Sequence, residues 1–91
     1  MACQVEAALA EVLGNLYTDE GTVNGSKTVT FPWRSRRLTI TNDSSSNDLT
    51  VTMGNTPLTL KPTESLSVKW WGTSLRLSSS GSVAYRVWVF G

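Results

Sequence analysis

Hydrophobic and polar residues alternate most clearly over the final residues of the chain, Ser82–Gly91. One set of alternate positions holds Val83, Tyr85, Val87 and Val89, and the other holds Ala84, Arg86, Trp88 and Phe90. This alternation predicts a β-strand, because successive side chains of a strand point to opposite faces. A strand with one face in water would keep that face polar, but here both sets carry large apolar side chains. We therefore expect both faces to be covered, in part by other protein chains.

Shorter segments with strand character precede this one, separated by residues that favour turns. The predicted strands are Lys27–Phe31, Arg37–Thr41, Leu49–Met53, Leu58–Leu60, Leu66–Trp70, Ser74–Leu77 and Ser82–Phe90. The expected core side chains are Leu38, Ile40, Leu49, Val51, Met53, Leu58, Leu60, Leu66, Val68, Trp70, Leu75 and Leu77, with Thr39, Thr41, Thr50, Thr52 and Thr59 facing outward. Short, regularly spaced strands predict a mainly β fold over residues 27–91, a small antiparallel β-sandwich or barrel, and we favour the sandwich.

The N-terminal segment has a different period. Val5, Leu9, Val12 and Leu16 recur at steps of three and four residues, which predicts an amphipathic helix over residues 1–17. Such a helix would cover the open side of the sheet or dock on a neighbouring subunit. Residues 18–26, which are polar and contain two glycines, are expected to form a connector.

Composition narrows the classes of function. The chain has 91 residues, which fits one domain, and its net charge of +1 gives no electrostatic case for nucleic acid or an anionic membrane as the main partner. Its single cysteine, Cys3, cannot form an internal disulfide, and no run of residues is apolar enough to span a membrane. The chain has no histidine and no phosphate-loop or calcium-loop motif, so we expect neither an enzyme nor a metal or cofactor site. Asn42, Asp43, Asn47 and Asp48 could bind calcium weakly, but a polar turn explains them better.

Tryptophans are the main candidates for binding. Trp70 is in phase with Leu66 and Val68, so we expect Trp70 in the core and Trp71 outside. An outward tryptophan could contact a neighbouring subunit, pack locally under the helix or bind a sugar. Aromatic enrichment at the centres of protein interfaces favours the subunit contact.

Two arginine features remain. The segment Phe31–Arg37 places three arginines around Ser35 and beside Trp33, an arrangement that could hold phosphates, although the nearly neutral chain favours a solvated edge or an interface loop. Arg86 lies in the middle of the last strand, where we expect it to pair with a carboxylate or to stack on an aromatic ring.

Residues 36–91 resemble small structural proteins of tailed bacteriophages. The resemblance is carried by Leu38-Thr-Ile-Thr-Asn-Asp43, Leu49-Thr-Val-Thr52, Leu58-Thr-Leu-Lys-Pro-Thr-Glu-Ser-Leu66 and Ala84-Tyr-Arg-Val-Trp-Val-Phe-Gly91. It implies a non-catalytic virion component, such as a decoration, head-fibre or tail-accessory protein, that is built on a β-sandwich and is often trimeric. After synthesis in the host cytoplasm, such a protein would be located in the virion.

These observations predict a structural subunit that assembles with copies of itself and with a larger capsid or tail protein. The expected interface residues are Val5, Leu9, Val12, Leu16, Trp33, Trp71, Arg86, Trp88 and Phe90. Two alternatives stay open: a carbohydrate-binding or adhesin-like module with Trp71, Trp33 and Tyr85 as sugar platforms, and a small nucleic-acid-binding barrel that uses Arg34, Arg36 and Arg37. No contact with a membrane is expected, and we regard nucleic acid as the weakest candidate partner.

Overall fold

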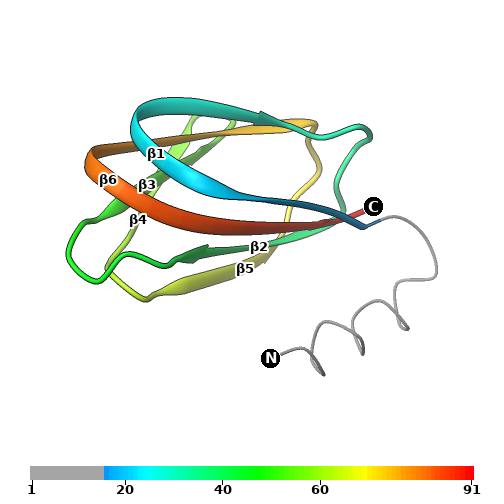
Figure 1. Ribbon diagram of the computed structural model, residues 1–91. Coiled ribbons are helices and arrows are strands. Elements are labelled where there is room, and N and C mark those ends of the chain that lie inside the picture. The colour runs from blue at the N-terminus through cyan, green and yellow to red at the C-terminus, as the bar shows by residue number, and fades with distance from the viewer. Residues whose placement is uncertain (1–15) are drawn as a thin grey trace, which may run out of the picture.

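The computed structural model describes residues 16–91, which form one six-stranded antiparallel sheet (Figure 1). The strands are β1 (Leu16–Thr30), β2 (Arg37–Asn42), β3 (Leu49–Met53), β4 (Thr56–Leu60), β5 (Ser65–Lys69) and β6 (Ser74–Phe90). Their order is β4-β3-β6-β2-β5, and β1 pairs with β6. The long strand β6 is the centre of the sheet, because β1 follows it along its length while β3 pairs with its first part and β2 with its last.

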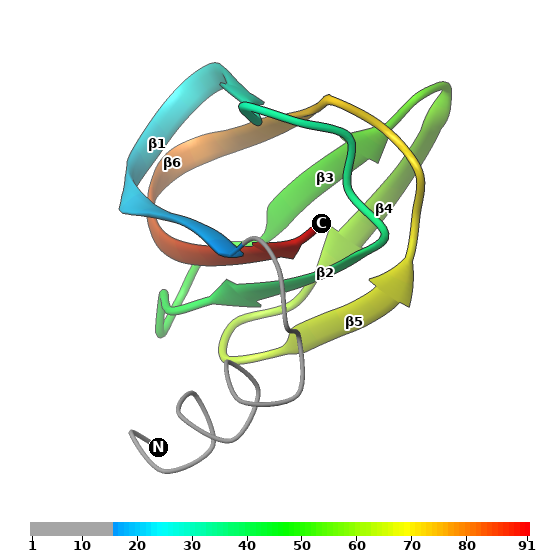
Figure 2. The same cartoon turned by 90° about the vertical axis from the view of Figure 1, so that its right-hand side faces the viewer.

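The paired strands β1 and β6 bend together, and this bend curls the sheet into a half-barrel (Figure 2). Their register passes from Val23 opposite Val83 to Gly25 opposite Ser79, so a single residue of β1 faces residues 80–82 of β6. Gly25 has a φ of +100°, a conformation that glycine adopts readily at a bulge. On one side of the bend β3 and then β4 extend the sheet from the first part of β6, and on the other side β2 and then β5 extend it from the last part.

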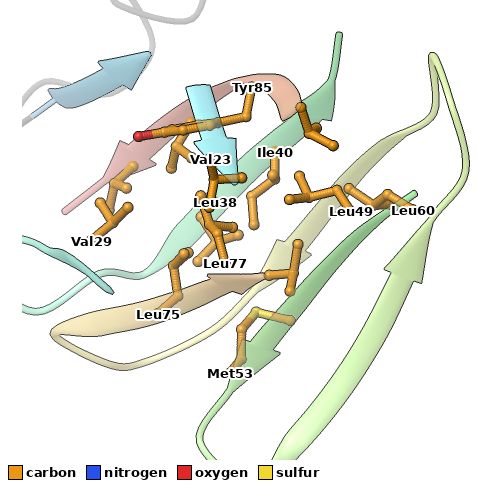
Figure 3. Packing of buried hydrophobic residues seen from close by; sticks show 14 of the residues in the cluster. Val23, Val29, Leu38, Ile40, Leu49, Met53, Leu60, Leu75, Leu77 and Tyr85 are labelled. Carbon is orange, nitrogen blue, oxygen red and sulfur yellow. The ribbon is translucent and has the colours of Figure 1, made fainter. Parts of the chain in front are cut away.

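Apolar side chains fill the space inside the curled sheet (Figure 3). The alternate positions Val83, Tyr85, Val87 and Val89 of β6 all point into this core, and each is almost completely buried. Most of the core predicted from the sequence is confirmed, with Leu66, Val68 and Trp70 packed at its margin. Leu58 is the exception, because it lies on the edge strand β4 and is 37% exposed.

The prediction of a β-sandwich was wrong, and so was the helical assignment of Leu16 and Tyr17. The strands belong to one continuous curled sheet, and residues 16–91 contain no helix. Leu16, which we placed on the helix, begins β1, and the expected connector 18–26 is part of the same strand. The last two predicted strands are likewise one strand, β6. Val5, Leu9, Val12 and the rest of the predicted helix up to residue 15 lie outside the described residues.

None of the elements formed by residues 16–91 is a helix of the length and apolarity that a membrane span needs.

Candidate binding groove on the outer face of the sheet

The outer face of β1, β6, β2 and β5 brings together side chains that are distant in the sequence. Strand register places Trp88 beside Thr39, and Thr39 beside Ser67. The neighbouring row along the strands contains Arg86, Thr41 and Ser65, and the row on the other side contains Phe90, Arg37 and Lys69. Large side chains of β6 therefore stand next to small hydroxyl side chains of β2 and β5.

Two hollows occupy this face and share Thr39 and Trp88 as lining residues. The first has a volume of about 540 Å³ and extends toward Arg37, Lys69 and Phe90. The second, of about 340 Å³, extends toward Arg86 and the end of β2. We call the two hollows together the Trp88 groove. Its floor is fixed by hydrogen bonds of 2.9 Å between the hydroxyls of Thr39 and Ser67 and between those of Thr41 and Ser65.

Arg86 is held rigidly at the side of the Trp88 groove. Its Nε donates to Oδ2 of Asp43 at 2.7 Å and its Nη2 donates to Oδ1 at 3.1 Å, a two-point contact that fixes the guanidinium plane. The same guanidinium lies 6.0 Å from the centroid of the Trp88 ring. Hydrogen bonding to Asp43 raises the pKa of Arg86, so it stays charged. The sequence left open a carboxylate or an aromatic partner for Arg86, and the structure shows both.

The loop between β2 and β3 positions Asp43 for this contact. Asn42 is completely buried, and its side-chain amide donates to the carbonyls of Asn47 at 2.9 Å and Leu60 at 3.0 Å. Its Oδ1 accepts a hydrogen bond from the backbone N–H of Ser44 at 2.9 Å. Asp48 pairs with Lys61 at 3.1 Å. The side chains of Asn42, Asp43, Asn47 and Asp48 thus each make a hydrogen bond or ion pair within the protein, and within residues 16–91 no three metal-ligating side chains cluster.

Four of the expected interface residues come together in the structure. Arg86, Trp88 and Phe90 lie on the outer side of β6, and Leu16 is directly opposite Phe90 in the register of β1 and β6. Trp88 is half-buried, while Phe90 is 9% exposed although it is not part of the inner core cluster. We expected both faces of this strand to be covered in part by other chains, and residues 16–91 cover the outer face only in part.

The other three tryptophans do not line the Trp88 groove. Trp71 is 60% exposed in the link between β5 and β6, and Trp70 packs edge-on against Phe31, so the predicted inward and outward directions of this pair are confirmed. Trp33 is half-buried against the core, and its ring lies so close to Gly91 that a Cβ there would overlap it.

Tyr85 cannot serve as a sugar platform, because its ring is 1% exposed. Its hydroxyl donates to Oδ2 of Asp19 at 2.9 Å, and Nζ of Lys27 lies 5.1 Å from the ring centroid. Burial raises the pKa of Tyr85, and hydrogen bonding with Tyr85 raises that of Lys27. Both pKa values move further from neutral pH. A catalytic tyrosine or lysine needs the opposite shift, a pKa lowered toward the working pH.

Sequence reasoning missed Thr39, Ser67 and Lys69 as lining residues of the groove, and it named Arg37 only as part of a separate arginine cluster. The available signal was the alternation that turned Thr39 and Thr41 outward. It could not reveal the neighbours of these residues, because strand register is not readable from a single strand.

Neither a family model nor a curated protein matches the chain. Solved structures do match. A de novo designed double-stranded β-helix is similar with a TM-score of 0.58 and 20% identity, over 78% of this chain and 95% of the designed one. A cupin-2 domain protein from Shewanella frigidimarina is similar with a TM-score of 0.57 and 9% identity, over 86% and 72% of the two chains. These similarities show the fold, a double-stranded β-helix or cupin-like β-barrel.

The C-terminal domain of A223, a structural protein from Sulfolobus turreted icosahedral virus, matches with a TM-score of 0.47 and 21% identity, over 84% of this chain and 95% of that one. A score below 0.5 does not establish a common fold, so nothing about this chain follows from that match. None of these proteins is described as a component of a tailed bacteriophage, so the resemblance seen in the sequence stays a prediction.

Proposed function

We propose that this protein is a non-enzymatic structural subunit that assembles with other protein chains through the Trp88 groove. The observation that carries the proposal is the half-buried Trp88 at the junction of two hollows, beside a floor of small hydroxyl side chains from β2 and β5. Tryptophan and arginine are the residues that contribute most to binding energy at the centres of protein interfaces.

The geometry of the groove suits a protein contact. The half-buried Trp88 offers apolar surface, and Arg86 is already oriented by Asp43, so little side-chain freedom is lost when a partner binds. Together with the resemblance of residues 36–91 to phage structural proteins, this leads us to propose a virion component that decorates a capsid or belongs to a head or tail accessory. Its partners would be copies of itself, in a trimer, and a larger capsid or tail protein.

The test compares two substitutions on the outer side of β6. Trp88→Ala removes the centre of the groove, whereas Arg76→Ala removes a large exposed side chain from the first half of the strand, outside the groove. Molar mass is measured by size-exclusion chromatography with light scattering over a hundredfold dilution. We expect the wild type and Arg76→Ala to form the same oligomer and Trp88→Ala to dissociate. A monomeric wild type, or an unchanged oligomer in Trp88→Ala, would contradict assembly through this groove.

A carbohydrate-binding module is the second candidate, and the hydroxyl floor beside Trp88 favours it specifically. A tryptophan ring can stack on a sugar while neighbouring hydroxyls bind sugar hydroxyls. A glycan array that compares the wild type with Trp88→Ala tests this function. Binding that disappears in the variant supports it, and an array without signal for the wild type rejects it.

A further inference from the structure

Two connecting segments are tied together at the end of the half-barrel that faces the viewer in Figure 2: residues 31–36, between β1 and β2, and residues 70–73, between β5 and β6. The backbone N–H of Ser35 donates to the carbonyl of Gly72 at 2.7 Å, and the N–H of Gly72 donates to Oγ of Ser35 at 3.2 Å. The N–H of Trp70 donates to the carbonyl of Arg36 at 3.2 Å. Ser35 is completely buried, so these contacts fix the two segments against each other.

This end of the half-barrel concentrates positive charge. Arg34, Arg36, Arg37 and Lys69 are all exposed there, and strand register places Arg37 directly opposite Lys69. Like charges in directly opposed positions destabilise a sheet. Within residues 16–91 the ion pairs are Lys61–Asp48 and Arg86–Asp43, so none of these four cations has a carboxylate within 4.0 Å in that part of the chain. The described residues offer no carboxylate that offsets the free-energy cost of this like-charge pair. An uncompensated cost of this kind indicates a negatively charged ligand.

The acidic residues of the described chain lie elsewhere. Asp43, Asp48 and Glu64 belong to the loops at the opposite end of β2 and β5, and Asp19 and Glu20 lie within β1, opposite Val87 and Arg86. The net charge of +1 for the whole chain therefore conceals a strong local separation of charge. The low net charge of the chain argued against a polyanionic partner, but this end of the half-barrel is locally strongly positive, so that argument does not apply to it.

An exposed aromatic ring completes the arrangement. Trp71 is 60% exposed and lies between Trp70, which packs against Phe31, and Gly72, whose backbone is bonded to Ser35. Its neighbours in the chain are thus fixed while its own ring remains accessible. Cations that hold phosphates, next to an aromatic ring on which a base can stack, are the combination that binds single-stranded nucleic acid. An acidic protein would satisfy the cations but gives no role to the exposed ring.

We propose that this basic end, formed by Arg34, Arg36, Arg37, Lys69 and Trp71, binds single-stranded nucleic acid. Guanidinium groups contact the phosphates, and the Trp71 ring stacks on a base. This activity is separate from assembly through the Trp88 groove, although Arg37 and Lys69 line one end of that groove. Binding would be largely independent of sequence, because stacking and phosphate contacts do not distinguish the bases.

The experiment uses fluorescence anisotropy of a labelled oligothymidylate of about 15 nucleotides, a length in the range of single-stranded binding sites, with the 91-residue chain. Four phosphate contacts predict a slope of about −3 for log affinity against log salt concentration. The double variant Arg34→Gln/Arg36→Gln should reduce the slope to about −1.5. Trp71→Ala should weaken binding about tenfold and leave the slope unchanged. Lys61→Gln, which removes an exposed cation at the opposite end, is the matched control and should bind like the wild type.

Two results would overturn the proposal. The first is the absence of saturable binding of the oligonucleotide at low salt. The second is polyglutamate of equal length binding as tightly as the oligonucleotide, with no effect of Trp71→Ala on either, which would identify the basic end as a site for acidic polypeptide. Circular dichroism spectra confirm that each variant is folded. The oligomer test with Trp88→Ala is independent, so assembly and nucleic-acid binding can fail separately.

Discussion

Asn42→Ala removes the side chain that closes the loop between β2 and β3. Asn42 is completely buried and makes three side-chain hydrogen bonds, to the carbonyls of Asn47 and Leu60 and from the N–H of Ser44. At a net contribution of about 1 kcal/mol for each bond, the free energy of unfolding should fall by about 3 kcal/mol. This is a large part of the roughly 5–14 kcal/mol expected for a domain of this size.

The assay is urea denaturation followed by tryptophan fluorescence. If the free energy of unfolding falls by about 1.5 kcal/mol for each molar of urea, the urea concentration at the unfolding midpoint should fall by about 2 M. Ser45→Ala, an exposed position in the same loop, should leave the midpoint unchanged. Asn42→Asp keeps the size of the side chain but loses both donors, so it should be destabilised at least as much as Asn42→Ala. A shift of less than about 0.5 M for either Asn42 variant would refute the assignment of this stability to the hydrogen bonds.

The remaining predictions concern pH and backbone conformation. The pKa of Tyr85 and that of Lys27 are both raised in the folded state, so the stability they contribute is complete below about pH 10 and is lost as the pH rises further. The urea midpoint should therefore fall above pH 10, and less steeply in Tyr85→Phe. Thr63 is a β-branched residue with a φ of +68°, so Thr63→Gly should raise the free energy of unfolding by about 0.5–1 kcal/mol, measured by urea denaturation. A Cβ at Gly72 would overlap the ring of Trp70, so Gly72→Ala should lower the melting temperature by an amount equivalent to about 1–3 kcal/mol.

Alternation along the chain was sufficient to predict most of the strands and the side chains that face the core. The residues Val83, Tyr85, Val87 and Val89 are buried as their spacing indicated, since burial on one face of a strand follows directly from the period of two. The outward direction of Trp71 followed from the same rule. These predictions succeeded because they depend only on local sequence and on the presence of a core.

The strand ends predicted at segments rich in glycine and serine were wrong. Residues 18–26 and 78–81 have the composition of turns, yet both lie inside long strands, and Gly25 and Ser79 are opposite each other where the β1–β6 pair bends. In this fold these residues permit a bulge and a sharp bend rather than a chain reversal. A single sequence does not distinguish these outcomes, because the bend exists only when both strands are paired. The same limit hid the Trp88 groove, whose three strands meet through long-range pairing.

In the proposed function, the inner face of β6 contributes to stability and its outer face to binding. The inner positions are committed to the core, and the backbone of the strand is paired on both sides by strands of the same chain. The outer positions Arg86 and Trp88 are only half-buried on this fixed strand, so in the proposed function their side chains contact a partner without holding the sheet together. A rigid support of this kind reduces the entropy that is lost on association. We therefore expect substitution of the half-buried Trp88 to change stability little while assembly changes, which is the behaviour of a dedicated interface.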